Sequence, residues 1–199
     1  MPVPFGDDVS AVDIGDEKLA VIKTDMLVDK TDVPPQMSLW QAARKAAVMN
    51  ISDLAAKGVK PIALLASLGL PPSLNRSDIE QIARGLNAGA REYGTYVLGG
   101  DTGEAPDLVI TCAAFGLGEE DRLMLRSGAQ EGDVVAVTGA FGKSAAGLRL
   151  LQQSLPSPQG LKKALLDTVL LPHARLSEGL ALAPPAAVTA SIASSVGLA

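Results

Sequence analysis

Residues 38–118 alternate between two kinds of segment, and this alternation limits the folds that the chain can adopt. Helical patterns begin at Ser38 and run to about Lys57, and a loop followed by a second helix fills 71–94. Apolar runs of strand length lie at 61–70, 96–100 and 107–118. Helices and strands in alternation bury their apolar sides against one another, so the pattern predicts helices packed on a sheet.

The flanking segments predict two units of α+β type. Two short strands, roughly 10–14 and 18–24, precede a polar loop at 29–37. A charged connector at 119–133 leads to a strand at 134–139, to helices near 143–153, 159–170 and 175–184, and to a tail at 186–199 that is typical of a strand entering a turn. We therefore predict one domain over 1–125 and a second, partial domain over 126–199.

Composition excludes some classes of function. The net charge of −5 gives no electrostatic reason to expect a nucleic-acid partner. The single cysteine, Cys112, lies in an apolar run and is predicted to be a buried strand residue. No apolar run is long enough to span a membrane and no signal segment opens the chain, so a cytoplasmic protein without a membrane partner is expected.

Asp53 lies inside the first predicted helix, in the stretch "VMNISDLAAKGVKP". Its neighbours at helical spacing are small or apolar, and a carboxylate on such a face is costly unless a cation or hydrogen-bond donors satisfy it. One interpretation is a partly exposed ion pair with Lys57, four residues later. The other is a ligand for a bound cation.

Other aspartates support the second interpretation. Asp8 precedes the first strand, Thr24 and Asp25 come where the second predicted strand ends, and Asp101 follows Gly100 at the end of "YVLGG". Each could also be an ordinary turn or capping residue. Carboxylates with a hydroxyl, and without histidine or cysteine, form the hard oxygen set that suits Mg²⁺ and its phosphate ligands.

Three weaker signals leave alternatives open. Gly139 and Gly142 in "VTGAFGKS" could hold phosphate at a helix start, or could form a plain strand–helix turn. Arg126 could pair with a phosphate, or could be a solvated charge in the connector. His173 has no obvious acid or nucleophile partner in the sequence, which predicts a surface or capping residue.

A family resemblance rests on five segments in order: "GDDVSAV", "KTDMLV", "NISDLAAKGVKP", "LGGDTGEAPD" and "RSGAQEGDVVAVTGAFGKSAAGLRLL". Together they resemble the thiamine-monophosphate kinases of the aminoimidazole-ribonucleotide synthase-like superfamily, and "DMLVDKTDVPPQM" is similar to the archaeal branch. The resemblance implies an N-terminal mixed-sheet domain that dimerises through its sheet, followed by a C-terminal α/β domain that is incomplete here.

The resemblance also implies a reaction, the transfer of the γ-phosphoryl group of ATP to thiamine monophosphate with Mg²⁺. It places the metal at Asp8, Thr24, Asp25, Asp53 and Asp101, and ATP at Gly100, Asp101 and Arg126. No catalytic side chain is assigned, because phosphoryl transfer depends mainly on positioning and charge neutralisation. The expected partners are this small substrate and a second copy of the chain.

The chain departs from the family pattern in three respects. Asp32 stands where many bacterial members carry a histidine for the substrate, so the substrate contacts are not assigned. Ala193 and Val196 stand where two metal-binding aspartates are expected, and the chain is shorter than a full member. The alternative hypothesis is therefore a catalytically impaired nucleotide-binding fragment or paralogue; selenophosphate synthetase, the synthase of purine biosynthesis and a scaffold without a ligand fit less well.

Overall fold

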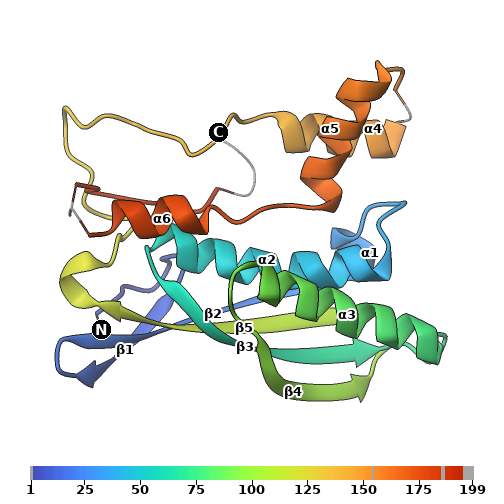
Figure 1. Ribbon diagram of the computed structural model, residues 1–199, viewed down its shortest axis with the longest axis horizontal. Helices are drawn as coiled ribbons and strands as arrows, with labels where there is room; N and C mark the ends of the chain where they lie inside the picture. Colours follow the sequence, from blue (N-terminus) through green and yellow to red (C-terminus); the bar gives the residue numbers. More distant parts are fainter. Residues whose placement is uncertain (1, 154, 185–186, 195–199) are drawn as a thin grey trace.

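The computed structural model describes residues 2–153, 155–184 and 187–194, and these form stacked layers of sheet and helices (Figure 1). The elements in chain order are β1 (Ser10–Gly15), β2 (Lys18–Val28), α1 (Asp29–Asp32), α2 (Leu39–Ala56), β3 (Lys60–Leu70), α3 (Arg76–Glu92), β4 (Val97–Glu104), β5 (Val109–Glu119), the 3₁₀ turn η1 (Glu120–Arg122), α4 (Lys143–Gln153), α5 (Gln159–Leu170) and α6 (Leu176–Leu182). The α+β class predicted from the sequence is confirmed.

The sheet is mixed and has five strands in the order β1-β2-β5-β3-β4. The β3–β4 pair is parallel, because α3 connects these two strands, and the other pairs are antiparallel. β2 pairs with β5 along its whole length, from Lys18 opposite Glu119 to Val28 opposite Val109. This central pairing extends β2 well beyond the strand end predicted at residue 24.

Helices α2 and α3 cover one face of this sheet. A capping box begins α2: Ser38 Oγ accepts from the Gln41 amide, and Gln41 Oε1 accepts from the Ser38 amide. Gly58 ends the helix with a φ of 71°, a left-handed conformation that glycine adopts without strain. The core lies between helices and sheet, and the predicted burial of Cys112 is confirmed there.

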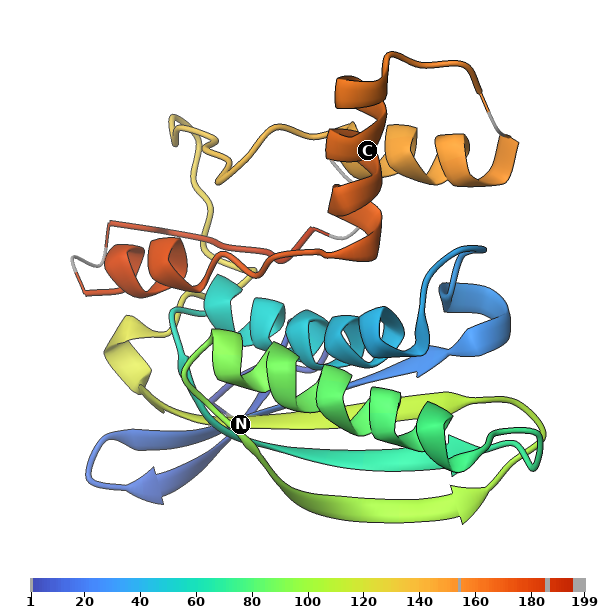
Figure 2. The ribbon, with the colours of Figure 1, turned by 45° about the vertical axis from the view of Figure 1, so that its right-hand side comes forward.

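A third layer lies on α2, on the side away from the sheet (Figure 2). It contains α6, which packs on α2, and the pair α4 and α5. Gly179 of α6 comes so close to α2 that a Cβ atom there would lie 1.9 Å from the Ala55 carbonyl oxygen. Among the described residues, no helix combines the length and apolar character that crossing a bilayer requires.

The second face of the sheet is not covered by any helix of the described chain (Figures 1 and 2). Along β2 and β5 its outward side chains alternate with more buried ones, as strand geometry requires. Large apolar side chains lie on this face, which we call the open face. They include Val12, Ile22, Met26, Leu65 and Leu117, each between 42% and 57% exposed.

Two of the predicted strands are wrong. Residues 134–139 form no strand, and Val134 and Val135 are 91% and 82% exposed. No strand of the described chain lies beside this segment, so its backbone has no ladder to join. The tail at 187–194 is likewise not a strand, and the rest of the predicted tail strand lies outside the described residues. Within the predicted partial domain, the described regular elements are therefore helices only.

Candidate functional site

Asp53 lies on the sheet-facing side of α2, where its side chain is 13% exposed. Its partner is Lys23 of β2, whose Nζ lies 2.7 Å from Asp53 Oδ2 and 3.2 Å from Asp25 Oδ1. The pairing of Asp53 with Lys57 proposed from the sequence is therefore wrong. Lys57 follows the last turn of α2 and points to a different set of carboxylates.

Lys57 is fully buried and binds the N-terminal loop. Its Nζ lies 2.7 Å from Asp7 Oδ1 and 2.9 Å from Asp8 Oδ2, and it donates to the Ser191 carbonyl oxygen at 2.8 Å. Both carboxylates are almost wholly buried as well. A buried charge needs a partner to compensate for its lost hydration, and here one ammonium serves two carboxylates.

Arg126 completes this cluster from the connector after β5. Its guanidinium donates to Asp8 Oδ1 and, at 3.0 Å, to the Gly6 carbonyl oxygen, while its amide donates to Asp7 Oδ2 at 2.8 Å. The Arg126 side chain is thus bound to the Asp8 carboxylate of its own chain, and its pairing with a phosphate stays a prediction. Asp8 also accepts from the Ala193 amide at 3.0 Å.

Electrostatics divide these aspartates into two groups. Burial raises the pKa of Asp53 to about 6 in spite of Lys23, and repulsion from Asp25 and Asp8 adds to this effect. Burial also opposes ionisation of Asp7 and Asp8, but Arg126 and Lys57 outweigh it and lower the pKa of both carboxyls. Of the three, Asp53 is therefore the carboxylate with the least compensation for its charge.

Thr24 and Asp25 lie inside β2 rather than at its end, which corrects their predicted place at a loop. Neighbouring strand residues point to opposite faces, so Asp25 lies on the helix side and Thr24 on the open face. The Thr24 hydroxyl donates to the Cys112 carbonyl oxygen at 3.1 Å. The Asp25 amide donates to Asn50 Oδ1 at 2.9 Å.

Asn50 is a residue of this region that sequence reasoning missed. It is buried on α2, and its Nδ2 donates to the Ala46 carbonyl oxygen while Oδ1 holds the backbone of Asp25. The signal that could have revealed it is a polar side chain on the same helical stripe as Asp53, three residues earlier. Asn50 fixes the position of Asp25 relative to α2.

Gly100 and Asp101 lie within β4, which continues to Glu104, so their predicted place at a strand end is also wrong. A Cβ atom on Gly100 would lie 1.7 Å from the Ala66 carbonyl oxygen, which gives this glycine a packing role. Asp101 is opposite Ser67 and lines a shallow cavity of about 310 Å³ with Gly69, Gly103 and Thr111. This cavity is on the open face, across the sheet from Asp53.

The remaining predicted residues lie apart from this cluster. Asp32 accepts from the Val28 amide at 2.8 Å and from Lys45 through its own carbonyl oxygen. Gly142, with a φ of 92°, precedes α4, but the strand expected before it is absent.

His173 is at the surface as predicted, and Glu92 supplies an acid partner, with His173 Nδ1 3.0 Å from Glu92 Oε1. Val196 lies outside the described residues.

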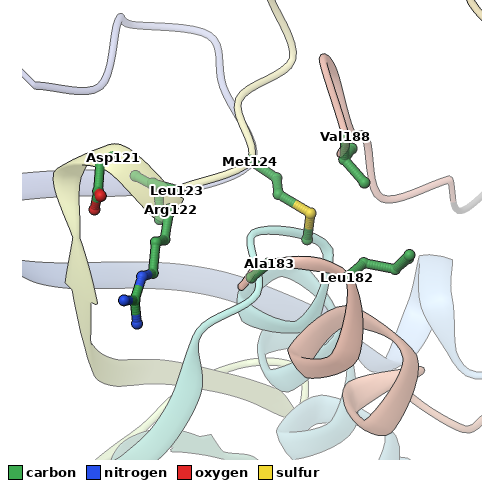
Figure 3. Close-up of a pocket in the computed structure, with 7 residues that line it drawn as sticks. All are labelled: Asp121, Arg122, Leu123, Met124, Leu182, Ala183 and Val188. Carbon is green, nitrogen blue, oxygen red and sulfur yellow. The ribbon is translucent and has the colours of Figure 1, made fainter. Parts of the chain in front are cut away.

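A second cavity, of about 180 Å³, lies between η1 and the end of α6 (Figure 3). Figure 3 shows Met124 reaching toward the end of α6, where Leu182 and Ala183 lie, with Asp121 and Arg122 on the η1 side. Its lining contains one aspartate, Asp121, which is not among the predicted ligands.

The donor set fits a divalent cation that shares its coordination with phosphate. Asp25 and Asp53 converge on one ammonium, and Asp7 and Asp8 converge on another. Over residues 2–153, 155–184 and 187–194, no three acidic, histidine or cysteine side chains are grouped to hold one metal ion by themselves. Mg²⁺ needs no such cage, since it binds one or two carboxylates together with water and phosphate oxygens.

Comparison with known proteins shows the family to which this chain belongs. Residues 6–118 match the family model "AIR synthase related protein, N-terminal domain". This match covers more than half of the chain and includes the whole sheet except the last residue of β5. The chain therefore belongs to the family of AIR synthase related proteins.

Within that family the chain is similar to thiamine-monophosphate kinases. It is 40% identical to the one from Pyrococcus horikoshii over 178 residues, which are 89% of this chain and 55% of the relative. It is 36% identical to the one from Escherichia coli K12, over 89% of this chain and 54% of the relative. The chain thus spans about half the length of these relatives.

A solved structure supports the same relationship. The structure described as "AaThiL complexed with AMPPCP and TMP" superimposes with a TM-score of 0.83 at 30% identity, over 90% of this chain and 57% of that chain. The solved structure described as thiamine monophosphate kinase from Aquifex aeolicus superimposes with a TM-score of 0.80 at 29% identity, over 89% of this chain and 59% of that chain.

Proposed function

We propose that the chain carries the ATP- and Mg²⁺-binding part of a thiamine-monophosphate kinase. The reaction is transfer of the γ-phosphoryl group of ATP to the phosphate of thiamine monophosphate, which yields ADP and thiamine diphosphate. One observation carries the proposal: residues chosen as ligands from the sequence gather around Asp53, which shares the Lys23 ammonium with Asp25 and interacts electrostatically with Asp8 and Arg126. The names of the similar proteins, and the AMPPCP and TMP in the similar solved structure, support the same chemistry.

Asp25 and Asp53 would hold the metal with the help of phosphate oxygens. Mg²⁺ supplies charge neutralisation at the transferring phosphoryl group. The Asn50 side chain links the two elements that carry these aspartates, because its Oδ1 on α2 accepts from the Asp25 amide on β2. The raised pKa of Asp53 is consistent with a carboxylate that gains from a second positive charge.

Arg126 and Asp8 would exchange partners when nucleotide binds. The guanidinium is partly exposed and bound to Asp8, so it is at the surface where a phosphate can reach it. An Arg–phosphate contact is bidentate and charge-assisted, and it replaces the Asp8 contact without leaving the guanidinium unpaired. Asp8 is then available to a cation, with Lys57 still beside it.

The open face is the proposed surface for a second copy of the chain. Its apolar side chains, with Met26 and Val12 more than half exposed, form a contiguous surface over β1, β2, β5 and β3. Exposed apolar surfaces of this extent are typical of subunit contacts. Asp101 and Thr24 lie on that face, so a dimer formed through it would bury or reposition two of the predicted ligands.

We also propose a domain boundary at residues 125 and 126. The sheet and its two covering helices precede this point, and only helices and extended segments of the described chain follow it. Ser191 donates back to the Leu125 carbonyl oxygen at 2.7 Å, so the segment at 187–194 runs beside the boundary.

A second candidate function is a nucleotide-binding protein of the same family with impaired turnover. Ala193 favours it, because the residue offers only its amide to Asp8 where the family resemblance places a carboxylate. A site with fewer carboxylates neutralises less of the phosphate charge or positions the metal less firmly. Binding without turnover is the expected behaviour in that case.

The test is calorimetric titration of Mg·ATP into the parent chain and into Asp53→Asn, followed by chromatographic detection of thiamine diphosphate. We expect the variant to bind at least about tenfold more weakly, a change of about 1.4 kcal/mol. Asp167→Asn, at an exposed position on α5, is the matched control and should bind as the parent does. Absence of Mg·ATP binding by the parent refutes the proposal, and binding without product supports the second candidate.

A further inference from the structure

Lys23 occupies the position between Asp25 and Asp53 that a bound cation would take. Its Nζ lies within 3.2 Å of one carboxylate and 2.7 Å of the other, and its side chain is 20% exposed. The two carboxylates come from different elements, β2 and α2, and both contact this ammonium. The contact is therefore a product of the folded structure.

Lys23 compensates the negative charge of Asp53 when no other cation is bound. Asp53 is repelled by both Asp25 and Asp8, and among the described residues Lys23 is the cation that forms an ion pair with its carboxylate. A metal ion at the same oxygens would bring the same compensation with twice the charge. The ammonium and the metal ion repel each other, so they cannot share this position at low cost.

We propose that Lys23 is a positioning residue that keeps free Mg²⁺ off the Asp25–Asp53 pair, so that the metal enters together with nucleotide. A free hydrated ion must displace the ammonium, and it gains only the two carboxylates as protein ligands. Mg²⁺ bound to ATP brings phosphate oxygens, which complete the metal's coordination and offer the released ammonium a new anionic partner. This inference rests on the proposed function for its nucleotide part alone.

The test measures metal binding without nucleotide, so it does not depend on activity. Mn²⁺ is titrated into the parent, Lys23→Met and Lys18→Met, and free Mn²⁺ is followed by electron paramagnetic resonance. We expect Lys23→Met to bind Mn²⁺ at least about tenfold more tightly than the parent, about 1.4 kcal/mol. Lys18, exposed at the start of the same strand, is the matched control for a lost positive charge and should leave binding unchanged.

Two further variants locate the effect. Lys23→Arg keeps the charge and should bind free Mn²⁺ as weakly as the parent. Adding Asp53→Asn to Lys23→Met should remove the gained affinity, because it deletes one of the two carboxylates. If Lys23→Met does not fold, as judged by its circular dichroism spectrum, Lys23→Gln takes its place.

The inference is overturned if folded Lys23→Met binds Mn²⁺ no better than the parent, or if the gain survives the loss of Asp53. Its failure is distinct from failure of the proposed function, which is judged by Mg·ATP binding to the parent. Suppose that the parent does not bind Mg·ATP but Lys23→Met binds Mn²⁺ more tightly than the parent. The kinase proposal would then be refuted, while the inference that Lys23 excludes free metal would stand.

Discussion

Replacing Lys57 by methionine should destabilise the folded chain more than any surface substitution. Methionine keeps most of the apolar stem of lysine and removes the ammonium from a site where lysine is fully buried. Asp7 and Asp8, whose side chains are 1% and 3% exposed, then lose the cation at 2.7 and 2.9 Å. The hydrogen bond to the Ser191 carbonyl oxygen is lost as well.

The magnitude follows from the partners that remain. Removing one member of a buried ion pair costs about 3–5 kcal/mol, because the other member stays buried without compensation. Arg126 still binds Asp8, and two backbone amides still bind Asp7, which places the expected loss near the lower end, about 3 kcal/mol. Asp7 is the carboxylate left with no cation at its side chain.

The assay is urea unfolding followed by circular dichroism, which gives the free energy of unfolding of each variant. Lys163→Met is the matched control, since its ion pair with Asp167 is at the surface, and it should change the free energy by less than about 0.5 kcal/mol. Adding Asp7→Asn to Lys57→Met should recover about 1–2 kcal/mol. A loss below about 0.5 kcal/mol for Lys57→Met would refute the view that this ammonium holds the N-terminal loop on α2.

Three other predictions concern the packing of α6, the effect of pH and the open face. Gly179→Ala should lower the free energy of unfolding by about 2 kcal/mol, because its Cβ atom would meet the Ala55 carbonyl oxygen; Gly160→Ala, with open space around it, should not lower it. Glu92→Gln should cost about 1 kcal/mol at pH 7, where the buried Arg44 loses its anionic partner. The folded protein lowers the pKa of Glu92, so this contribution is present above the ordinary value of 4.5 and disappears as the pH falls through the lower folded value; urea unfolding at pH 7 and pH 3.5 measures the difference. Met26→Asp should shift the chain from dimer to monomer in sedimentation velocity, and a parent that is already monomeric would contradict the proposed role of the open face.

The helices and central strands could be predicted from sequence because their signals are local. The capping box at Ser38, the glycine end at Gly58 and the apolar run around Cys112 each act within a few residues. The prediction of a strand at 134–139 is wrong because that strand depends on contacts that are not local. Its apolar residues satisfy the local pattern, but a strand also needs a neighbour for its hydrogen bonds, and local pattern contains no information about that neighbour.

The candidate site was predicted as a set of residues and not as a set of contacts. The residue types identified Asp8, Asp25 and Asp53 as a hard oxygen set, and the structure brings them into one region. The expected partner of Asp53 was wrong, because helical spacing offered Lys57 while the fold offers Lys23 from a strand that pairs with β5. His173 gained an acid partner in the same way, since Glu92 is far from it in the chain.

By itself, the sequence determined the α+β class, the positions of most elements and the chemical kind of ligand that the aspartates could bind, since these follow from side-chain pattern and type. Only the tertiary structure decided which cation neutralises which carboxylate, and that Thr24 and Asp101 lie across the sheet from Asp53. The physical reason is that ion pairs depend on distances of a few ångströms between residues distant in the chain. Those distances are set by strand register and by the packing of α2 on the sheet.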